Sequence, residues 1–260
     1  MQTDSLELSF LSIFSLISFF TFFIIQKYSH KIYKESIFDD DFEKPQSFHE
    51  TKTPRSGGLA SILSIVIFVF LYDKLFSYFY ADYLVIGLGL FLIGFLEDIK
   101  IKSSPKKRLI LMMIFLFLSI QLFSLNIFYI DIKFLSELLT IKVFLTIFVL
   151  LCFLFIINGS NLIDGFNGLL ALQLIIINSV LLYVNLENNN TELIVLLISQ
   201  IIILLTFLLF NFPLAKMFMG DSGAYLFGAV TSLNVIYTNN LNSNVSSFFY
   251  CILLFYLFFE

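Results

Sequence analysis

Residues 193–210 read LIVLLISQIIILLTFLLF, an eighteen-residue run without a charged side chain. A second uncharged run, VFLTIFVLLCFLFII, covers residues 143–157. Hydrophobic residues make up 59% of the 260-residue chain and charged residues 13%, about half of the roughly 25% that is usual in soluble domains. A soluble protein of this size could not bury so many helices that are apolar on every side. The composition therefore predicts an integral membrane protein.

Similar apolar segments recur along the chain, without a Pro- or Ser-rich linker or an internal repeat. We therefore expect one domain over residues 1–260 and an all-α, polytopic fold with about nine transmembrane helices. These lie near residues 7–26, 57–72, 83–96, 109–125, 143–157, 168–186, 193–210, 222–237 and 246–259. Asp4 and Glu7 precede or begin the first segment and no small-residue cleavage pattern is present, which indicates a retained span.

The basic residues are unequally divided between the two sides that these spans define. Twelve of the fifteen Lys and Arg residues fall in odd-numbered connections, and only Lys74, Lys133 and Lys142 fall in even-numbered ones. Because basic loops stay in the cytoplasm, we expect the odd connections to be cytoplasmic and the N-terminus to be outside. Four unusual polar clusters lie in those odd connections, so they are expected to meet at one membrane face.

The first cluster is HETKTPRSGG at residues 49–58. Pro54 disfavours helix at Thr53, and the pair Gly57-Gly58 lets the backbone approach a ligand or another helix closely. Arg55 offers a fork of donors suited to phosphate. A helix-entry turn with ordinary cytoplasmic anchors accounts for the same residues, and this stretch alone does not decide between the two interpretations.

The second cluster joins GFLED at residues 94–98 to SSPKKR at residues 103–108. The adjacent acids Glu97 and Asp98 are costly at the end of an apolar helix unless they face water, a cation or a partner. Such a pair suits divalent-metal and phosphate chemistry, in which one carboxylate holds Mg²⁺ and the other takes a proton. An interfacial acid pair facing the basic run 106–108 is the simpler alternative.

The third cluster is NGSNLIDGFNG at residues 158–168, and the fourth is NFPLAKMFMGDSG at residues 211–223. At helical spacing Asn161, Asp164 and Asn167 would lie near one face, which glycines would open to a substrate; hydrogen bonding between helices is the alternative. In the fourth cluster, Asp221 stands between glycines just before an apolar helix. It could cap that helix, whose N-terminus also favours phosphate.

With these motifs the sequence resembles the polyprenyl-phosphate N-acetylhexosamine-1-phosphate transferases, the glycosyltransferase 4 group of membrane enzymes. The resemblance covers nearly the whole chain, and it rests most specifically on NLIDGFNG at residues 161–168 and FMGDSG at residues 218–223. The stretch TPRSGG at residues 53–58 looks more like the O-antigen and cell-surface glycan branch than the peptidoglycan-precursor branch.

The sequence departs from the family pattern at three places. Glu97 stands where the family has the first acid of an Asp-Asp pair, and Asn167 stands at the second acid of its Asp-Gly-x-Asp-Gly motif. Family members also continue into a cytoplasmic loop with a histidine-rich motif, and neither His30 nor His49 stands in that position. We therefore expect the C-terminal part of the family domain to be missing from this sequence.

The resemblance implies transfer of an N-acetylhexosamine-1-phosphate from a UDP-sugar to polyprenyl (undecaprenyl) phosphate in the bacterial inner membrane, releasing UMP and initiating O-antigen-like (lipopolysaccharide) glycan synthesis. It implies Mg²⁺, with Mn²⁺ as a substitute, on Asp221. It assigns catalytic roles to Glu97, Asp98 and Asp164, and substrate binding to Arg55, Asn161, Asn167 and Asn211. Lys106, Lys107 and Arg108 are weaker candidates for attracting phosphate. No nucleic-acid partner is expected, and a homodimer is left open.

Two other functions remain alternatives. A transporter would show acids or broken helices near the bilayer midplane, often in paired halves, whereas the unusual residues here gather at one face. A truncated, inactive relative that serves as a membrane partner is the other alternative, because the histidine-rich loop is not in the sequence.

Overall fold

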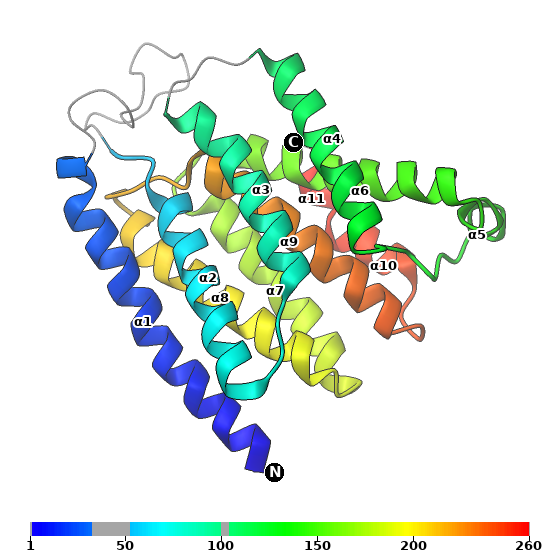
Figure 1. Cartoon of the computed structure of the whole chain (residues 1–260), viewed down its shortest axis with the longest axis horizontal. Helices are drawn as coiled ribbons and strands as arrows, with labels where there is room; N and C mark the ends of the chain where they lie inside the picture. Colours follow the sequence, from blue (N-terminus) through cyan, green and yellow to red (C-terminus); the bar gives the residue numbers. More distant parts are fainter. Residues whose placement is uncertain (1, 33–52, 100–103, 260) are drawn as a thin grey trace.

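The computed structural model describes residues 2–32, 53–99 and 104–259, which form α-helices and loops without a strand among them (Figure 1). The helices are α1 (Gln2–Ile32), α2 (Gly57–Phe76), α3 (Ala81–Asp98), α4 (Pro105–Leu122), α5 (Lys133–Leu139), α6 (Lys142–Ile163), α7 (Leu169–Glu187), α8 (Thr191–Asn211), α9 (Gly220–Leu241), α10 (Ser247–Leu253) and α11 (Phe255–Phe259). The all-α expectation is confirmed.

Within the described ranges, five helices are long and apolar enough to cross a membrane, namely α1, α2, α6, α7 and α8. Their outward faces carry large apolar side chains, such as Phe20, Ile147 and Leu205, which are 56%, 50% and 49% exposed. A soluble protein would not leave so many of these in water, whereas a bilayer accommodates them. The structure thus agrees with a membrane-embedded chain.

The expectation of about nine transmembrane helices is not confirmed. Helix α3 contains three acids, Asp82, Glu97 and Asp98, and α4 begins with three consecutive basic residues after Pro105. The segment expected at 246–259 is broken at Leu254 into α10 and α11, each too short to cross a bilayer. The short helix α5 was not expected at all.

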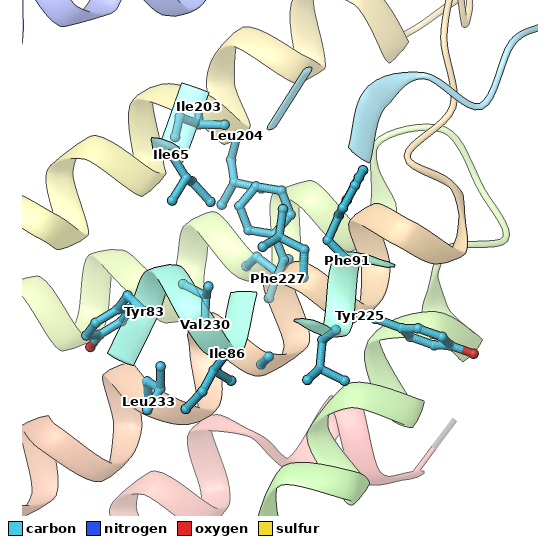
Figure 2. Close-up of a cluster of buried hydrophobic side chains, with 14 of the residues drawn as sticks. Ile65, Tyr83, Ile86, Phe91, Ile203, Leu204, Tyr225, Phe227, Val230 and Leu233 are labelled. Carbon is cyan, nitrogen blue, oxygen red and sulfur yellow. The ribbon is translucent and has the colours of Figure 1, made fainter. Parts of the chain in front are cut away.

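Helix α9 is the centre of the bundle (Figure 1), where it packs against α2, α3, α6 and α7. Seventeen of its 22 residues are buried. Phe227, Val230 and Leu233 of α9 pack with Ile86 and Phe91 of α3 in the apolar core shown in Figure 2. A helix buried on nearly all sides needs no apolar outer face, which explains why α9 is more polar than the spans around it.

Asn234, within α9, forms hydrogen bonds with two neighbouring helices. The Asn234 amide donates to Asn178 of α7 at 3.0 Å and to Gln200 of α8 at 2.6 Å. All three side chains are at most 1% exposed. Because an unpaired amide at this depth is costly, the network favours one alignment of α7, α8 and α9. That alignment places the starts and ends of these helices, where the motif residues lie.

Candidate active site

Asp98, at the end of α3, holds the first turn of α9. Its two carboxylate oxygens accept hydrogen bonds from the backbone N–H groups of Asp221 and Ser222, each at 3.0 Å. The side chain is 1% exposed, and it places negative charge at the positive end of the helix dipole. Asp221 is the second residue of α9, with Met219 at the N-cap position. The reading of Asp221 as the N-cap is therefore wrong, because α3 supplies the capping carboxylate.

Burial is the main influence on the Asp98 carboxyl, which lies two residues beyond the expected apolar segment 83–96. Burial raises the pKa of Asp98, as does the negative charge of Asp221, and the balance of all influences is a pKa of about 6. Hydrogen bonds from Ser222 and the positive charge of Arg55, whose Nη1 lies 3.6 Å from Asp98 Oδ1, lower that pKa. The position thus combines a desolvated carboxyl with donors that favour its charged form.

The segment before α2 forms backbone hydrogen bonds with the segment before α9. Phe218 N–H donates to the Pro54 carbonyl at 2.9 Å, and Gly57 N–H donates back to the Phe218 carbonyl at 2.8 Å. A Cβ atom at Gly58 would lie 2.5 Å from the backbone nitrogen of Gly223. The glycine pair therefore serves the close approach of two chain segments, and it also places Arg55 beside Asp98.

Glu97 points to a different partner from its neighbour Asp98. Arg108 of α4 lies between acids, with its Nη1 3.6 Å from Glu97 Oε1 and 3.3 Å from Asp221 Oδ2. The Arg108 guanidinium also stands 5.6 Å from the ring centroid of Tyr225, a cation–π distance. Of the basic residues 106–108, Arg108 therefore contacts the acids, whereas Lys106 and Lys107 are exposed. Lys100, Lys102 and residues 49–52 lie outside the described residues.

The third cluster is not one helical face, as the spacing had predicted. Helix α6 ends at Ile163, residues 164–168 form a turn, and α7 begins at Leu169. Gly168 has φ +77°, a conformation that β-carbons disfavour and that ends regular helix. Asn161 remains on α6, while Asp164 and Asn167 reach the same region from the turn. The prediction of one shared helix face is wrong because the chain leaves the helix at Asp164 and Gly168 then precedes a new helix.

Asn211, the last residue of α8, fixes this turn to the fourth cluster. Its side-chain oxygen accepts from Gly168 N–H at 2.6 Å, and its amide donates to the Met217 carbonyl at 2.9 Å. Asn167 in turn donates to the Pro213 carbonyl at 3.1 Å. Asn211 is 3% exposed. Its side chain therefore joins two loops that are more than forty residues apart in the sequence.

These segments enclose a cavity of about 110 Å³. Six of the eight predicted site residues line it, namely Arg55, Asn161, Asp164, Asn167, Asn211 and Asp221. Glu97 and Asp98 are outside the lining but contact Arg108 and Arg55. Gly165 also lines it, and sequence reasoning missed the three remaining residues of the wall, Phe166, Phe218 and Gly220. The sequence could have indicated these three residues, because each stands within a motif beside a predicted site residue.

The donor set of the cavity suits a hard cation shared with a phosphate ligand. Asp164 and Asp221 supply carboxylate oxygens, and the asparagines supply amide oxygens. Among the described residues no three His, Cys, Asp or Glu side chains are grouped closely enough to hold a metal by themselves. Mg²⁺ commonly binds to one or two carboxylates plus substrate phosphates. The residues present therefore fit Mg²⁺ bound together with a diphosphate.

Comparison with known proteins identifies the family. The model of glycosyl transferase family 4 matches residues 80–239, more than half of the chain. The chain belongs to this family. The match includes α3 with its acid pair, Arg108, the turn 164–168 and the start of α9, and so it covers most of the site described above. The family expectation is confirmed.

Curated relatives carry the name phospho-N-acetylmuramoyl-pentapeptide-transferase. The one from Dictyoglomus turgidum is 29% identical over 235 residues, which cover 85% of this chain and 73% of the relative. The one from Staphylococcus saprophyticus is 32% identical over 72% of this chain and 63% of the relative. The one from Bacillus subtilis is 29% identical over 75% of this chain and 64% of the relative. The chain thus spans about two thirds of the length of these relatives, whose names do not support the expected closeness to the O-antigen branch.

Proposed function

We propose that this chain transfers a phospho-N-acetyl-sugar from a UDP-linked donor to polyprenyl phosphate, in a Mg²⁺-dependent reaction at the cytoplasmic face of a bacterial inner membrane. The observation that carries the proposal is the cavity lined by Arg55, Asp164 and Asp221, where the first, third and fourth motif clusters meet. The second cluster adjoins it through the contact between Asp98 and Arg55. The family match and the names of the relatives support the same reaction class. The N-terminus is placed outside on the distribution of basic residues alone.

Transfer of a phosphoryl-linked sugar depends mainly on alignment and charge neutralisation. Arg55 stands at the cavity wall with its guanidinium also beside Asp98, so it can bind a phosphate oxygen without losing its orientation. Arg108 can bind a second phosphate from its position between Glu97 and Asp221. A bound Mg²⁺ would supply charge stabilisation of the diphosphate and of the leaving UMP. Asp221 is the residue that would hold it.

In this proposal the two adjacent acids, Glu97 and Asp98, have different roles. Asp98 is a positioning residue, since both of its oxygens hold the amides that begin α9. Glu97 is one-third exposed at its side chain and contacts Arg108, so it is the acid that can meet the lipid phosphate. Asp164, which lines the cavity, is the other candidate for proton transfer. The asparagines Asn161, Asn167 and Asn211 would bind nucleotide or sugar.

Two kinds of UDP-linked sugar donor are candidates for this site. The relatives are named for a phospho-N-acetylmuramoyl-pentapeptide group, whereas the TPRSGG stretch led to the expectation of a plain UDP-N-acetylhexosamine. N-acetylmuramic acid is itself an N-acetylhexosamine bearing a lactyl ether, so one cavity chemistry serves both. We propose the N-acetylmuramoyl-pentapeptide donor first, on the relatives' names, and the plain N-acetylhexosamine as the second substrate to test.

The test measures incorporation of labelled sugar phosphate into lipid, with each donor and with Mg²⁺ varied. Asp221→Asn should lower transfer by about a hundredfold or more, as expected for removing a group that stabilises transferred charge. Glu137→Gln, an exposed acid on α5, is the matched control and should leave transfer unchanged. In parallel, calorimetry should show that UDP binding requires Mg²⁺ and is weakened by Asp221→Asn. Parent-like transfer and nucleotide binding in Asp221→Asn would remove Asp221 from the site.

A further inference from the structure

A second and larger cavity, of about 560 Å³, lies at the other end of the same helices. Its wall includes Asp82 near the start of α3, Glu192 near the start of α8 and Tyr237 near the end of α9. Asp82 is sixteen residues before Asp98, and Tyr237 is sixteen residues after Asp221. At 1.5 Å per residue the cavity is about 24 Å from the candidate active site. It therefore opens at the opposite side of the membrane and is a separate site.

The charge of this cavity is entirely negative. Asp82 and Glu192 line it, and no Lys or Arg is among its lining residues, all of which belong to the described part of the chain. The Tyr237 hydroxyl donates to Asp82. Burial, the hydrogen bond to Glu192 and the negative charges of Glu192 and Asp82 together raise the pKa of Tyr78 to about 12. Tyr78 is thus a neutral hydrogen-bond donor at neutral pH.

The walls between the two acids are aromatic. The rings of Tyr78 and Tyr80 lie 4.8 Å apart between centroids, and those of Tyr83 and Tyr237 lie 5.9 Å apart. Aromatic faces attract cations, most strongly where water is partly excluded. Carboxylates set among aromatic rings form a site whose chemistry matches an organic cation.

One buried polar atom points to a ligand independently of the acids. Tyr83 is 3% exposed and lines the cavity, yet its hydroxyl has no hydrogen-bond partner among the described residues. Figure 2 shows Tyr83 and Tyr225 at opposite ends of the apolar core, so Tyr83 belongs to the end away from the candidate active site. Buried hydroxyls are almost always paired, and the absence of a partner calls for one from outside the protein.

We propose that this cavity binds a soluble organic compound with more than one primary ammonium group, of the polyamine class. Ammonium N–H groups can donate to Asp82, to Glu192 and to the hydroxyl oxygen of Tyr83, while the alkyl chain packs on the aromatic rings. A lipid headgroup carrying phosphate fits less well, because the lining offers it no cation. A neutral sugar would use the rings and hydroxyls but would leave the half-buried carboxylate of Asp82 and the exposed one of Glu192 without a counter-ion.

In the test, spermidine is titrated into the whole chain in an uncharged polyoxyethylene detergent at low salt, and calorimetry measures the binding. We expect one saturable site that weakens as salt is raised. Asp82→Asn and Glu192→Gln should each weaken binding by about tenfold or more, and Tyr83→Phe by a smaller factor. Glu187→Gln removes an exposed acid that does not line the cavity and should bind as the parent does. Thermal unfolding of each variant verifies that it is folded.

Three results would overturn the proposal. Absence of saturable spermidine binding by the folded parent is the first. Equal weakening by Glu187→Gln and by the two cavity variants would show only general attraction of the polyamine to acids. The third is binding of maltotriose at the same affinity, or binding of phosphatidylethanolamine nanodiscs in preference to spermidine, which would assign the cavity to a sugar or to a lipid headgroup.

Discussion

Gly94→Ala should disturb the candidate active site by displacing α9, although the substitution replaces no polar residue. Helix α3 passes the start of α9 so closely that a Cβ atom at Gly94 would lie 2.5 Å from the Asp221 carbonyl oxygen and 2.6 Å from Ser222 Cα. Ordinary contact begins at 3.4 Å, so the first turn of α9 must retreat by about 0.9 Å. These contacts are backbone atoms, which cannot rotate away as a side chain can.

The size of the effect follows from that displacement. Overpacking of this kind costs about 1–3 kcal/mol of stability. A shift of about 1 Å in a positioned group can lower the rate about a hundredfold. The shift would also stretch the two 3.0 Å hydrogen bonds from α9 to Asp98. We therefore expect a folded but less stable protein with about a hundredfold lower transfer.

Gly87→Ala is the matched control on the same helix, facing the same partner two turns earlier. A Cβ atom there would meet only the side-chain ends Leu226 Cδ1 at 3.1 Å and Val230 Cγ2 at 3.8 Å. It should retain transfer within about threefold, since those side chains can adjust. The assays are labelled sugar-phosphate incorporation at matched membrane abundance and the thermal unfolding midpoint. Equal transfer and equal stability of the two variants would refute the reasoning, as would parent-like behaviour of Gly94→Ala.

Two further predictions concern sidedness and the acid pair. Cysteines introduced at the exposed positions Lys107 and Asn188 should be labelled from opposite sides of the membrane, Lys107 from the cytoplasm; labelling of both from one side would reject the topology. Asp98→Asn should lower the free energy of unfolding by about 1–2 kcal/mol, because an amide cannot accept both helix N–H groups. Glu97→Gln should change the free energy of unfolding by less than about 0.5 kcal/mol, since its side chain is partly exposed. Chemical denaturation measures both variants, and a larger loss of stability for Glu97→Gln than for Asp98→Asn would contradict the assigned contacts.

The sequence by itself determined the membrane character, the helical class and the positions of the site residues. Uncharged runs such as residues 193–210 can satisfy their backbone in a bilayer only as helices, so that inference needs no tertiary information. The same holds for Pro54, which keeps Thr53 outside α2. Six of the eight chosen residues line one cavity, because clusters of Gly, Asn and acids between apolar segments are rare without a site.

Only the tertiary structure decided how those residues are used. Glu97 and Asp98 are adjacent and chemically alike, yet Asp98 turns inward to cap a helix that begins 122 residues later and Glu97 turns toward α4. The turn after Ile163 is held in place by Asn211 of another helix, which accepts a hydrogen bond from Gly168 N–H. The cavity around Asp82, Glu192 and Tyr83 has no motif, because its residues come singly from loops and helix ends that meet only when α9 is packed at the centre. Local pattern fixes what a segment prefers, whereas the partner of a charge or hydroxyl is fixed by which distant backbone comes within about 3 Å of it.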